Sequence, residues 1–188
     1  SYYSLSGCSM AVAAASGAAM LLTEYYGRLF PNQRMSAGTI KGLMINTADD
    51  IDAVGPDYRT GWGMINIGAA CEHLRRHAPF PELGLVREDS LSSANLTDSF
   101  SFTWTNTGPI KVTLCWTDPA GPALTDLDDP TPVLVNDLDL RIMDPSGSTN
   151  FPYVLDPALP AALATTGDNA LDNVEQVYIS APAAGGEY

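Results

Sequence analysis

The spacing of apolar residues divides the chain into two parts with different periodicity. Over residues 9–26 nearly every position is apolar or small, and Gly27 follows, so this stretch predicts a helix that is buried on all its faces and ends near that glycine. Apolar residues at helical spacing after Ser36 predict a second helix with this serine as its N-cap. A third helix is predicted over residues 67–76. The first part of the chain is therefore expected to be mainly helical.

Beyond residue 83 the apolar residues alternate with polar ones. Every second residue is apolar in "DSFSFTWT", "KVTLCWTD" and "NDLDLRIMDPSG", and "VEQVYISAP" adds one more strand. Short strands separated by turns predict an all-β antiparallel sandwich or jelly roll. Two prolines mark a linker at residues 79–82, between a domain over residues 1–78 and a domain over residues 83–188. The final "PAAGGEY" looks like the beginning of a strand, so we expect the second domain to be truncated at its C-terminal end.

Composition narrows the possible classes of function. The chain has 22 acidic and 9 basic residues and a net charge of −13, which argues against binding to nucleic acid or to an anionic membrane surface. The apolar run at residues 10–22 is shorter than the roughly 20 residues that span a bilayer, so no membrane span is expected. Three cysteines are too few and too scattered for a disulfide framework or a zinc cage.

The hexapeptide "SGCSMA" allows more than one role for Ser9. A serine at the start of a helix is most often an N-cap, which is a structural role. A second interpretation is the nucleophile elbow of an α/β-hydrolase, because residues 7–11 nearly fit G-x-S-x-G. That motif needs an apolar strand before it and an acid and a histidine after it. His73 and His77 lie at the end of a predicted helix beside arginines, where they are badly placed to act as the base.

A third interpretation of Ser9 rests on a resemblance. Residues 7–11, Gly-Cys-Ser-Met-Ala, resemble the Gly-Thr-Ser-Met-Ala motif that carries the nucleophile of subtilisin-like serine proteases. Cys8 replaces the threonine, and Ala13 stands where that family usually has a proline. "IKGLMINTADD" and "GPDYRTGWGMINIGAA" resemble the next helix and the Gly-rich segment with the final helix of that catalytic domain. "KVTLCWTDPAGP", "LVNDLDLRIMDPSG" and "NVEQVYISAPAAGGEY" resemble the β-sandwich domain appended in a subgroup of bacterial alkaline subtilases.

The resemblance implies the C-terminal part of an α/β catalytic domain followed by a β-sandwich. It implies that Ser9 is the nucleophile of a secreted serine endopeptidase that cleaves peptide substrates, and that its backbone N–H donates to the oxyanion. In subtilisins the aspartate and the histidine precede the serine. We therefore expect both, the asparagine that is the second oxyanion donor and a signal peptide to lie upstream, and this piece alone to be inactive. The alternative is a non-catalytic binding or structural module from a degenerate subtilase.

The second part of the chain carries a dense run of carboxylates. Between Lys111 and Arg141 there is no lysine or arginine, and the acidic residues there are Asp118, Asp126, Asp128, Asp129, Asp137 and Asp139. Most such runs are solvated surfaces, but closely spaced carboxylates also suit Ca²⁺, which takes oxygen ligands. The resemblance implies calcium in general terms as well. The candidate calcium ligands are Asp137, Asp139, Asp172 and Glu175, and no organic cofactor is expected.

Overall fold

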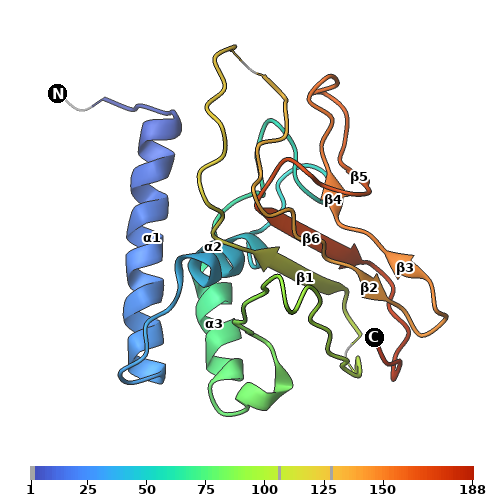
Figure 1. The fold of residues 1–188 in the computed structure, drawn as a ribbon. Coiled ribbons are helices and arrows are strands. Elements are labelled where there is room, and N and C mark those ends of the chain that lie inside the picture. Colours follow the sequence, from blue (N-terminus) through green and yellow to red (C-terminus); the bar gives the residue numbers. More distant parts are fainter. Residues whose placement is uncertain (1–2, 106, 128) are drawn as a thin grey trace.

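The helices come first along the chain, as the apolar pattern predicts. The computed structural model describes residues 3–105, 107–127 and 129–188, so that Asp128 of the acidic run lies outside the described residues (Figure 1). Three α-helices are followed by one turn of 3₁₀ helix, and their bounds are α1 Cys8–Leu29, α2 Ala37–Asn46, α3 Ile67–His77 and η1 Pro81–Leu83. The predicted end of the first helix at Gly27 is wrong, because α1 continues to Leu29, which packs against the helical core.

Side chains cap two of these helices at their N-termini. The Ser36 Oγ accepts a hydrogen bond of 3.1 Å from the backbone N–H of Thr39, which confirms Ser36 as the N-cap of α2. At the start of α3 the Asn66 Oδ1 accepts one of 2.8 Å from the backbone N–H of Ala69. Each cap satisfies a backbone donor that has no partner inside its helix, so the caps fix where α2 and α3 begin.

The helical core lies where the three helices meet. Helix α1 packs against α3 and α2, and the buried residues of this core are Leu22, Met35, Leu43, Ala70 and Leu74. Val86, which follows η1, is partly buried against the same core. The predicted division into domains at residues 79–82 stays a prediction.

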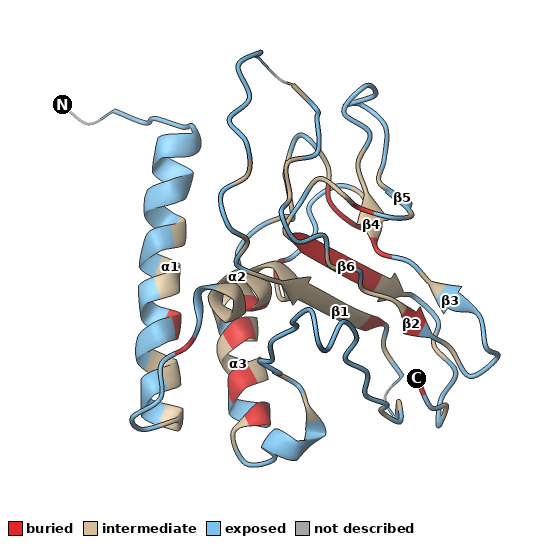
Figure 2. Cartoon of the chain, viewed as in Figure 1, coloured by how far each residue is buried: buried red, intermediate tan, exposed pale blue. Residues whose placement is uncertain are grey.

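Most of α1 is exposed, whereas the sequence predicted a helix buried on all faces. Leu22 is the buried residue of α1, and the helix is pale blue over most of its surface in Figure 2. The exposed fractions are 63% for Val12, 74% for Met20 and 60% for Leu21. The prediction is wrong for the described residues because α2 and α3 cover one side of α1 and leave its other apolar side in solvent.

The second part of the chain forms three antiparallel pairs of strands. The longest pair joins β1 Ile110–Cys115 to β6 Val174–Ile179, in a register that sets Ile110 opposite Ile179 and Cys115 opposite Val174. The two shorter pairs are β2 Ile142–Met143 with β3 Thr149–Asn150, and β4 Tyr153–Val154 with β5 Thr165–Thr166. The alternating segments "KVTLCWTD" and "VEQVYISAP" thus form the predicted strands.

Within the described ranges these pairs do not close into the predicted sandwich or jelly roll. Each sheet has two strands, and residues 98–105 contribute only an isolated bridge between Thr103 and Glu187. The segment between β1 and β2 is a long loop that contains Pro119, Pro122, Pro130 and Pro132. Proline has no backbone N–H to give to a ladder, so this loop cannot extend the sheet as a regular strand.

A second, separate core holds the strands together. Ile110, Ile142, Val177 and Tyr188 are buried there, with Phe102 and Trp104 packed against them as their alternation predicts. The backbone N–H groups of Phe102 and Tyr188 each donate to the other residue's carbonyl oxygen at 3.0 Å. The phenol oxygen of Tyr188 accepts a hydrogen bond of 2.6 Å from Ala183 N.

Helix α2 joins the helical part to the strands by lying against β1. Gly38 allows this close approach, because a Cβ there would lie 3.2 Å from the Cys115 carbonyl oxygen, whereas a Cβ on Gly42 would lie 3.8 Å from the Cys115 sulfur, which is an ordinary contact. Burial raises the pKa of the Cys115 thiol to about 11, so this cysteine packs as a neutral side chain. The Thr113 hydroxyl of β1 donates to Asn46 Oδ1 of α2 at 2.9 Å.

Candidate active site

A glycine sets the sharp turn at which α1 begins. Gly7 is the N-cap residue, with φ 147° and ψ 172°, a backbone conformation that is essentially restricted to glycine. Its carbonyl oxygen accepts hydrogen bonds from Met10 N at 3.1 Å and from Ala11 N at 3.2 Å. Because of this turn, the chain passes directly from the residues before Gly7 into the helix, which begins at Cys8. Ser9 therefore lies in the first turn of α1.

Ser9 is exposed and does not cap the helix. The N-cap position belongs to Gly7, and no side chain caps α1 by a hydrogen bond. The interpretation of Ser9 as an N-cap is therefore wrong. Because Ser9 lies in the first turn, its backbone N–H is one of the four that have no acceptor within the helix, and the positive end of the helix dipole lies there. Among the residues that the structure describes, neither the hydroxyl nor the backbone N–H of Ser9 has a hydrogen-bond partner, so one residue offers both groups.

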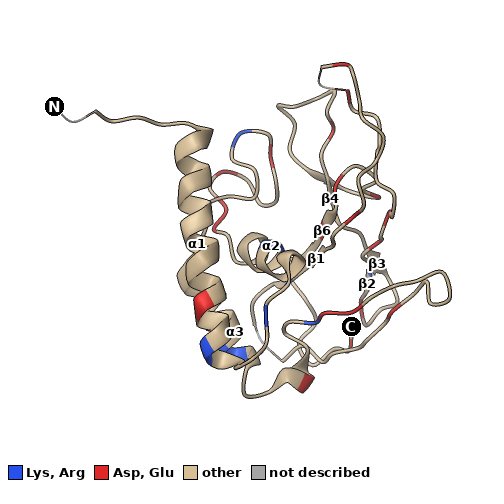
Figure 3. Cartoon of the chain, turned by 60° about the vertical axis from the view of Figure 1, so that its left-hand side comes forward, with Lys and Arg blue, Asp and Glu red and all other residues tan. Residues whose placement is uncertain are grey.

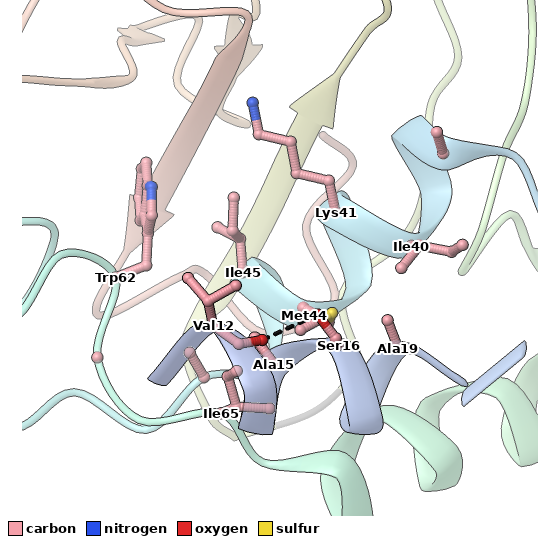
Figure 4. Close-up of a pocket in the computed structure, with 13 residues that line it drawn as sticks. Val12, Ala15, Ser16, Ala19, Ile40, Lys41, Met44, Ile45, Trp62 and Ile65 are labelled. Carbon is pink, nitrogen blue, oxygen red and sulfur yellow. Dashed lines mark hydrogen bonds between the residues drawn. The ribbon is translucent and has the colours of Figure 1, made fainter. Parts of the chain in front are cut away.

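A hollow of about 520 Å³ begins one turn beyond Ser9 (Figure 4). Val12, Ala15 and Ser16 of α1 line it on one side, and Ile40 and Met44 of α2 on the other. The Ser16 hydroxyl donates to the Val12 carbonyl oxygen at 2.9 Å, so it is turned back onto its own helix. Residues three apart on a helix are neighbours, so Ser9 adjoins Val12, which lines this apolar hollow.

The two histidines lie far from Ser9, at the opposite end of α1. The ring of His77 packs against Phe30, the C-cap residue of α1, with ring centroids 5.8 Å apart. A helix rises about 1.5 Å per residue, which puts Phe30 about 30 Å from Ser9. His73 is held by a contact of 2.8 Å between its Nε2 and the Leu85 carbonyl oxygen. Neither histidine can take a proton from Ser9 in this arrangement, as the sequence predicted.

Residues 3–23, which lead into α1 and form its first turns, include no charged side chain. The charged residues of α1 are Glu24 and Arg28, which pair with each other near its C-terminal end (Figure 3). Carboxylates lie in the strand part and its loops and also in the loop between α2 and α3, which contains Asp49, Asp50, Asp52 and Asp57 (Figure 3). An uncharged helix start leaves the local electrostatics to the helix dipole and to any group brought next to it.

The four predicted calcium ligands do not come together as one set. Asp139 and Glu175 lie in one cluster with Asp168, in which one carboxylate oxygen of each residue lies within 4.8 Å of the others. Asp137 and Asp172 are exposed and lie outside this cluster. Asp168 was missed as a candidate, because no motif or spacing in the sequence distinguishes it from the other aspartates of this region.

Arg141 was also missed, although the sequence shows it as the first basic residue after the acidic run. Its Nη2 lies 2.7 Å from Asp139 and 2.5 Å from Asp168, and its Nη1 lies 3.7 Å from Glu175. The guanidinium therefore contacts all three carboxylates of the cluster.

The comparison with known protein families finds a match in the helical part of the chain. Residues 1–63 match the subtilase family. This matched segment contains Ser9, all of α1 and α2, and the glycine-rich turn before α3. Subtilases are serine peptidases, so the family agrees with the resemblance carried by residues 7–11.

Similarity to a curated protein extends into the strands. The "Serine protease/ABC transporter B family protein tagA" of Dictyostelium discoideum is 30% identical over 151 residues, which cover 74% of this chain and 8% of that protein. A continuous stretch that covers 74% of the chain must include β1. The chain thus spans less than a tenth of the length of this relative. Within the ranges that the structure describes, no helix combines the length and the apolar character needed to cross a membrane.

Proposed function

We propose that this chain supplies the nucleophile of a subtilase-type serine endopeptidase, and that Ser9 is that nucleophile. The observation that carries the proposal is the state of Ser9: an exposed hydroxyl without a capping bond, on the first turn of a long helix, behind a glycine-only turn. The family match over residues 1–63 supports it. A serine that served only as a helix cap would have its hydroxyl bonded to a backbone N–H.

The chemistry follows from the position of Ser9. A base takes the proton of the Oγ as this oxygen attacks a peptide carbonyl, and the carbonyl oxygen becomes an oxyanion. The backbone N–H of Ser9 donates to that oxyanion, aided by the helix dipole. The proton then passes to the leaving amine, an acyl ester forms on Ser9, and water hydrolyses the ester. The substrates are peptides or proteins.

The base and its orienting carboxylate come from outside the described arrangement around Ser9. We propose that a histidine and an aspartate of a preceding segment supply them, in the chain order of subtilisins. The apolar surface of α1 supports this, because Val12, Met20 and Leu21 are largely exposed, and Val12 also lines the hollow shown in Figure 4. Further parts of the catalytic domain would cover this surface and bring the base to Ser9.

The test is the reaction of the intact protein with a fluorophosphonate, which labels only serines activated by a base. Peptide mass spectrometry should find the label on Ser9, and Ser9→Ala should abolish labelling. Ser16→Ala is the matched control, because Ser16 is an exposed serine two turns along the same helix whose hydroxyl is bonded to Val12. That variant should label like the unmodified protein.

Absence of label on folded, processed protein would overturn the proposal. Labelling that survives Ser9→Ala would overturn it as well, since the activated serine would then lie elsewhere. In either case the alternative from the sequence, a non-catalytic binding or structural module of a degenerate subtilase, would be preferred.

A further inference from the structure

One exposed segment connects the helical core to the core of the strands. Val86 packs against the helical core and Phe102 against the other core, and residues 87–101 between them are all exposed. The segment follows the mostly pale blue trace between η1 and β1 in Figure 2. Exposed connections of this kind are frequent sites of proteolytic cleavage and of function. None of these residues belongs to the site around Ser9, so the segment is open to a different role.

An ion pair and a backbone pair fold the middle of this segment into a small hairpin. The Arg87 guanidinium lies 2.8 Å from the Asp98 carboxylate and thereby joins the two ends of the loop between them. Inside this loop Ser92 N donates to the Asn95 carbonyl oxygen at 3.0 Å, and Asn95 N donates to that of Ser92 at 2.9 Å. The two residues between them form the turn. The backbone of Asn95 is thus held by the turn, while its side chain is at the surface.

Asn95 begins a modification motif. Residues 95–97 read Asn-Leu-Thr, which fits the acceptor pattern for N-linked glycosylation, Asn-x-Ser/Thr with x other than proline. No other asparagine in the sequence has serine or threonine two residues after it. The Asn95 side-chain amide has no hydrogen-bond partner among the described residues, whereas the amides of Asn136 and Asn173 donate to protein oxygens. The motif therefore coincides with an exposed asparagine whose Nδ2 is available to react.

We propose that Asn95 is the acceptor of an N-linked glycan. The co-reactant is an oligosaccharide carried on a lipid diphosphate, as in a eukaryotic secretory pathway. The Asn95 Nδ2 forms a bond to C1 of the first sugar, the bond from C1 to the diphosphate oxygen breaks, the amide loses one proton, and the lipid diphosphate leaves. No group is oxidised or reduced. The proposal requires that the protein is secreted through such a pathway, and it does not depend on catalysis by Ser9.

A glycan on Asn95 protects the connection that carries it. Leu91 and Leu96 flank the pair formed by Ser92 and Asn95, and their exposed fractions are 40% and 77%. Phe100, farther along the segment, is 51% exposed. A bulky hydrophilic glycan beside these side chains covers apolar surface and hinders the access of a protease to the backbone. The consequence is slower cleavage within residues 87–101.

The experiment uses the intact protein secreted from a yeast that attaches N-linked glycans. Peptide mass spectrometry, before and after treatment with an amidase that removes such glycans, shows which asparagines carry one. Asn95 should carry a glycan, and Asn95→Gln and Thr97→Ala should each abolish it. Thr97→Ser keeps the motif and is the matched control, which should retain the glycan. Asn32 is exposed and is followed by Gln33 and Arg34, so it is an internal control that should stay unmodified.

Limited digestion with chymotrypsin, which cuts after leucine and phenylalanine, tests the protective role. The glycosylated protein and Thr97→Ser should be cleaved within residues 87–101 more slowly than Asn95→Gln and Thr97→Ala, and an incubation without chymotrypsin corrects for cleavage by the protein itself. Asn95 without a glycan in folded, secreted protein would overturn the proposal. Equal cleavage of all four proteins would overturn the protective role. Both readouts are separate from the labelling of Ser9, so the failure of one proposal is distinguishable from the failure of the other.

Discussion

The Ser9 hydroxyl and the Glu175 Oε1 both lack a hydrogen-bond partner among the described residues, but they lie in opposite environments. The Ser9 hydroxyl is in solvent at the start of α1, where water satisfies it and the missing bond costs nothing. The Glu175 Oε1 is buried away from water, so its missing bond costs free energy. An unpaired group in solvent is free to react, whereas a buried one demands a permanent partner. The first is therefore expected to carry chemistry and the second structure.

The largest expected effect is the loss of catalysis, without a loss of stability, when the Ser9 hydroxyl is removed. Ser9→Ala should lower kcat by about six orders of magnitude, the scale found when the nucleophile of such a triad is removed. The free energy of unfolding should change by less than about 0.5 kcal/mol, because the side chain is exposed and unbonded. Peptide hydrolysis and denaturant unfolding of the same preparation check both statements. Unchanged hydrolysis in Ser9→Ala would mean that Ser9 is not the nucleophile, and a large loss of stability would mean that its side chain has a structural role.

The exposed apolar face of α1 offers the next test. Leu22 is buried, whereas its neighbour Leu21 is 60% exposed. If further parts of the catalytic domain cover this face, Leu21→Ala should destabilise the intact protein by about 2–5 kcal/mol, as Leu22→Ala should. Denaturant unfolding of both variants measures this. A cost below about 0.5 kcal/mol for Leu21→Ala alone would mean that the face stays in solvent.

Gly7, the N-cap residue of α1, and Gly27, within α1, should respond to alanine in opposite directions. Gly7→Ala strains the backbone by about 1–3 kcal/mol, because φ is 147° there, and should displace Ser9 so that kcat/KM falls about tenfold or more. Gly27→Ala has open space around the added Cβ and should stabilise the helix by about 0.5–1 kcal/mol without changing kcat/KM. Steady-state kinetics and thermal unfolding of the pair test this, and equal effects would show that the turn at Gly7 is not what positions Ser9.

The smallest expected effect is a pH dependence from His77. Burial, with a contribution from the charge of His73, lowers the pKa of His77 below its ordinary value of 6.5. The unfolded chain then binds the proton more readily than the folded protein, so this contribution to stability is present above about pH 6.5 and is lost as the pH falls. Urea unfolding across this range should show the fall, and it should shrink in His77→Phe. An identical profile in the variant would assign the effect to other groups.

The parts of the fold that could be predicted from sequence are those with local causes. Apolar periodicity and the caps Ser36 and Asn66 define α2 and α3, and the alternating residues of β1 and β6 define the longest pair of strands. The end of α1 was missed because a glycine costs a helix only about 1 kcal/mol, and the packing of Leu29 outweighs that cost. The sandwich was expected from strand-like segments whose pairing depends on residues far away in sequence.

The candidate sites divide in the same way. Ser9 could be found because its motif is continuous in the sequence, although only the structure shows that Gly7 and not Ser9 caps the helix. The carboxylate cluster could be found only in part, because Asp168 is 27 residues from Arg141 and meets it through the fold. Secretion and the domain boundary stay predictions.

The most direct test of the central claim is an experimental structure of the intact protein. The account predicts that a histidine of another segment lies with a ring nitrogen roughly 2.6–3.2 Å from the Ser9 Oγ, and that the apolar face of α1 around Leu21 is covered. A structure in which no titratable base lies within reach of Ser9, directly or through one water, would contradict the assignment of Ser9 as a nucleophile.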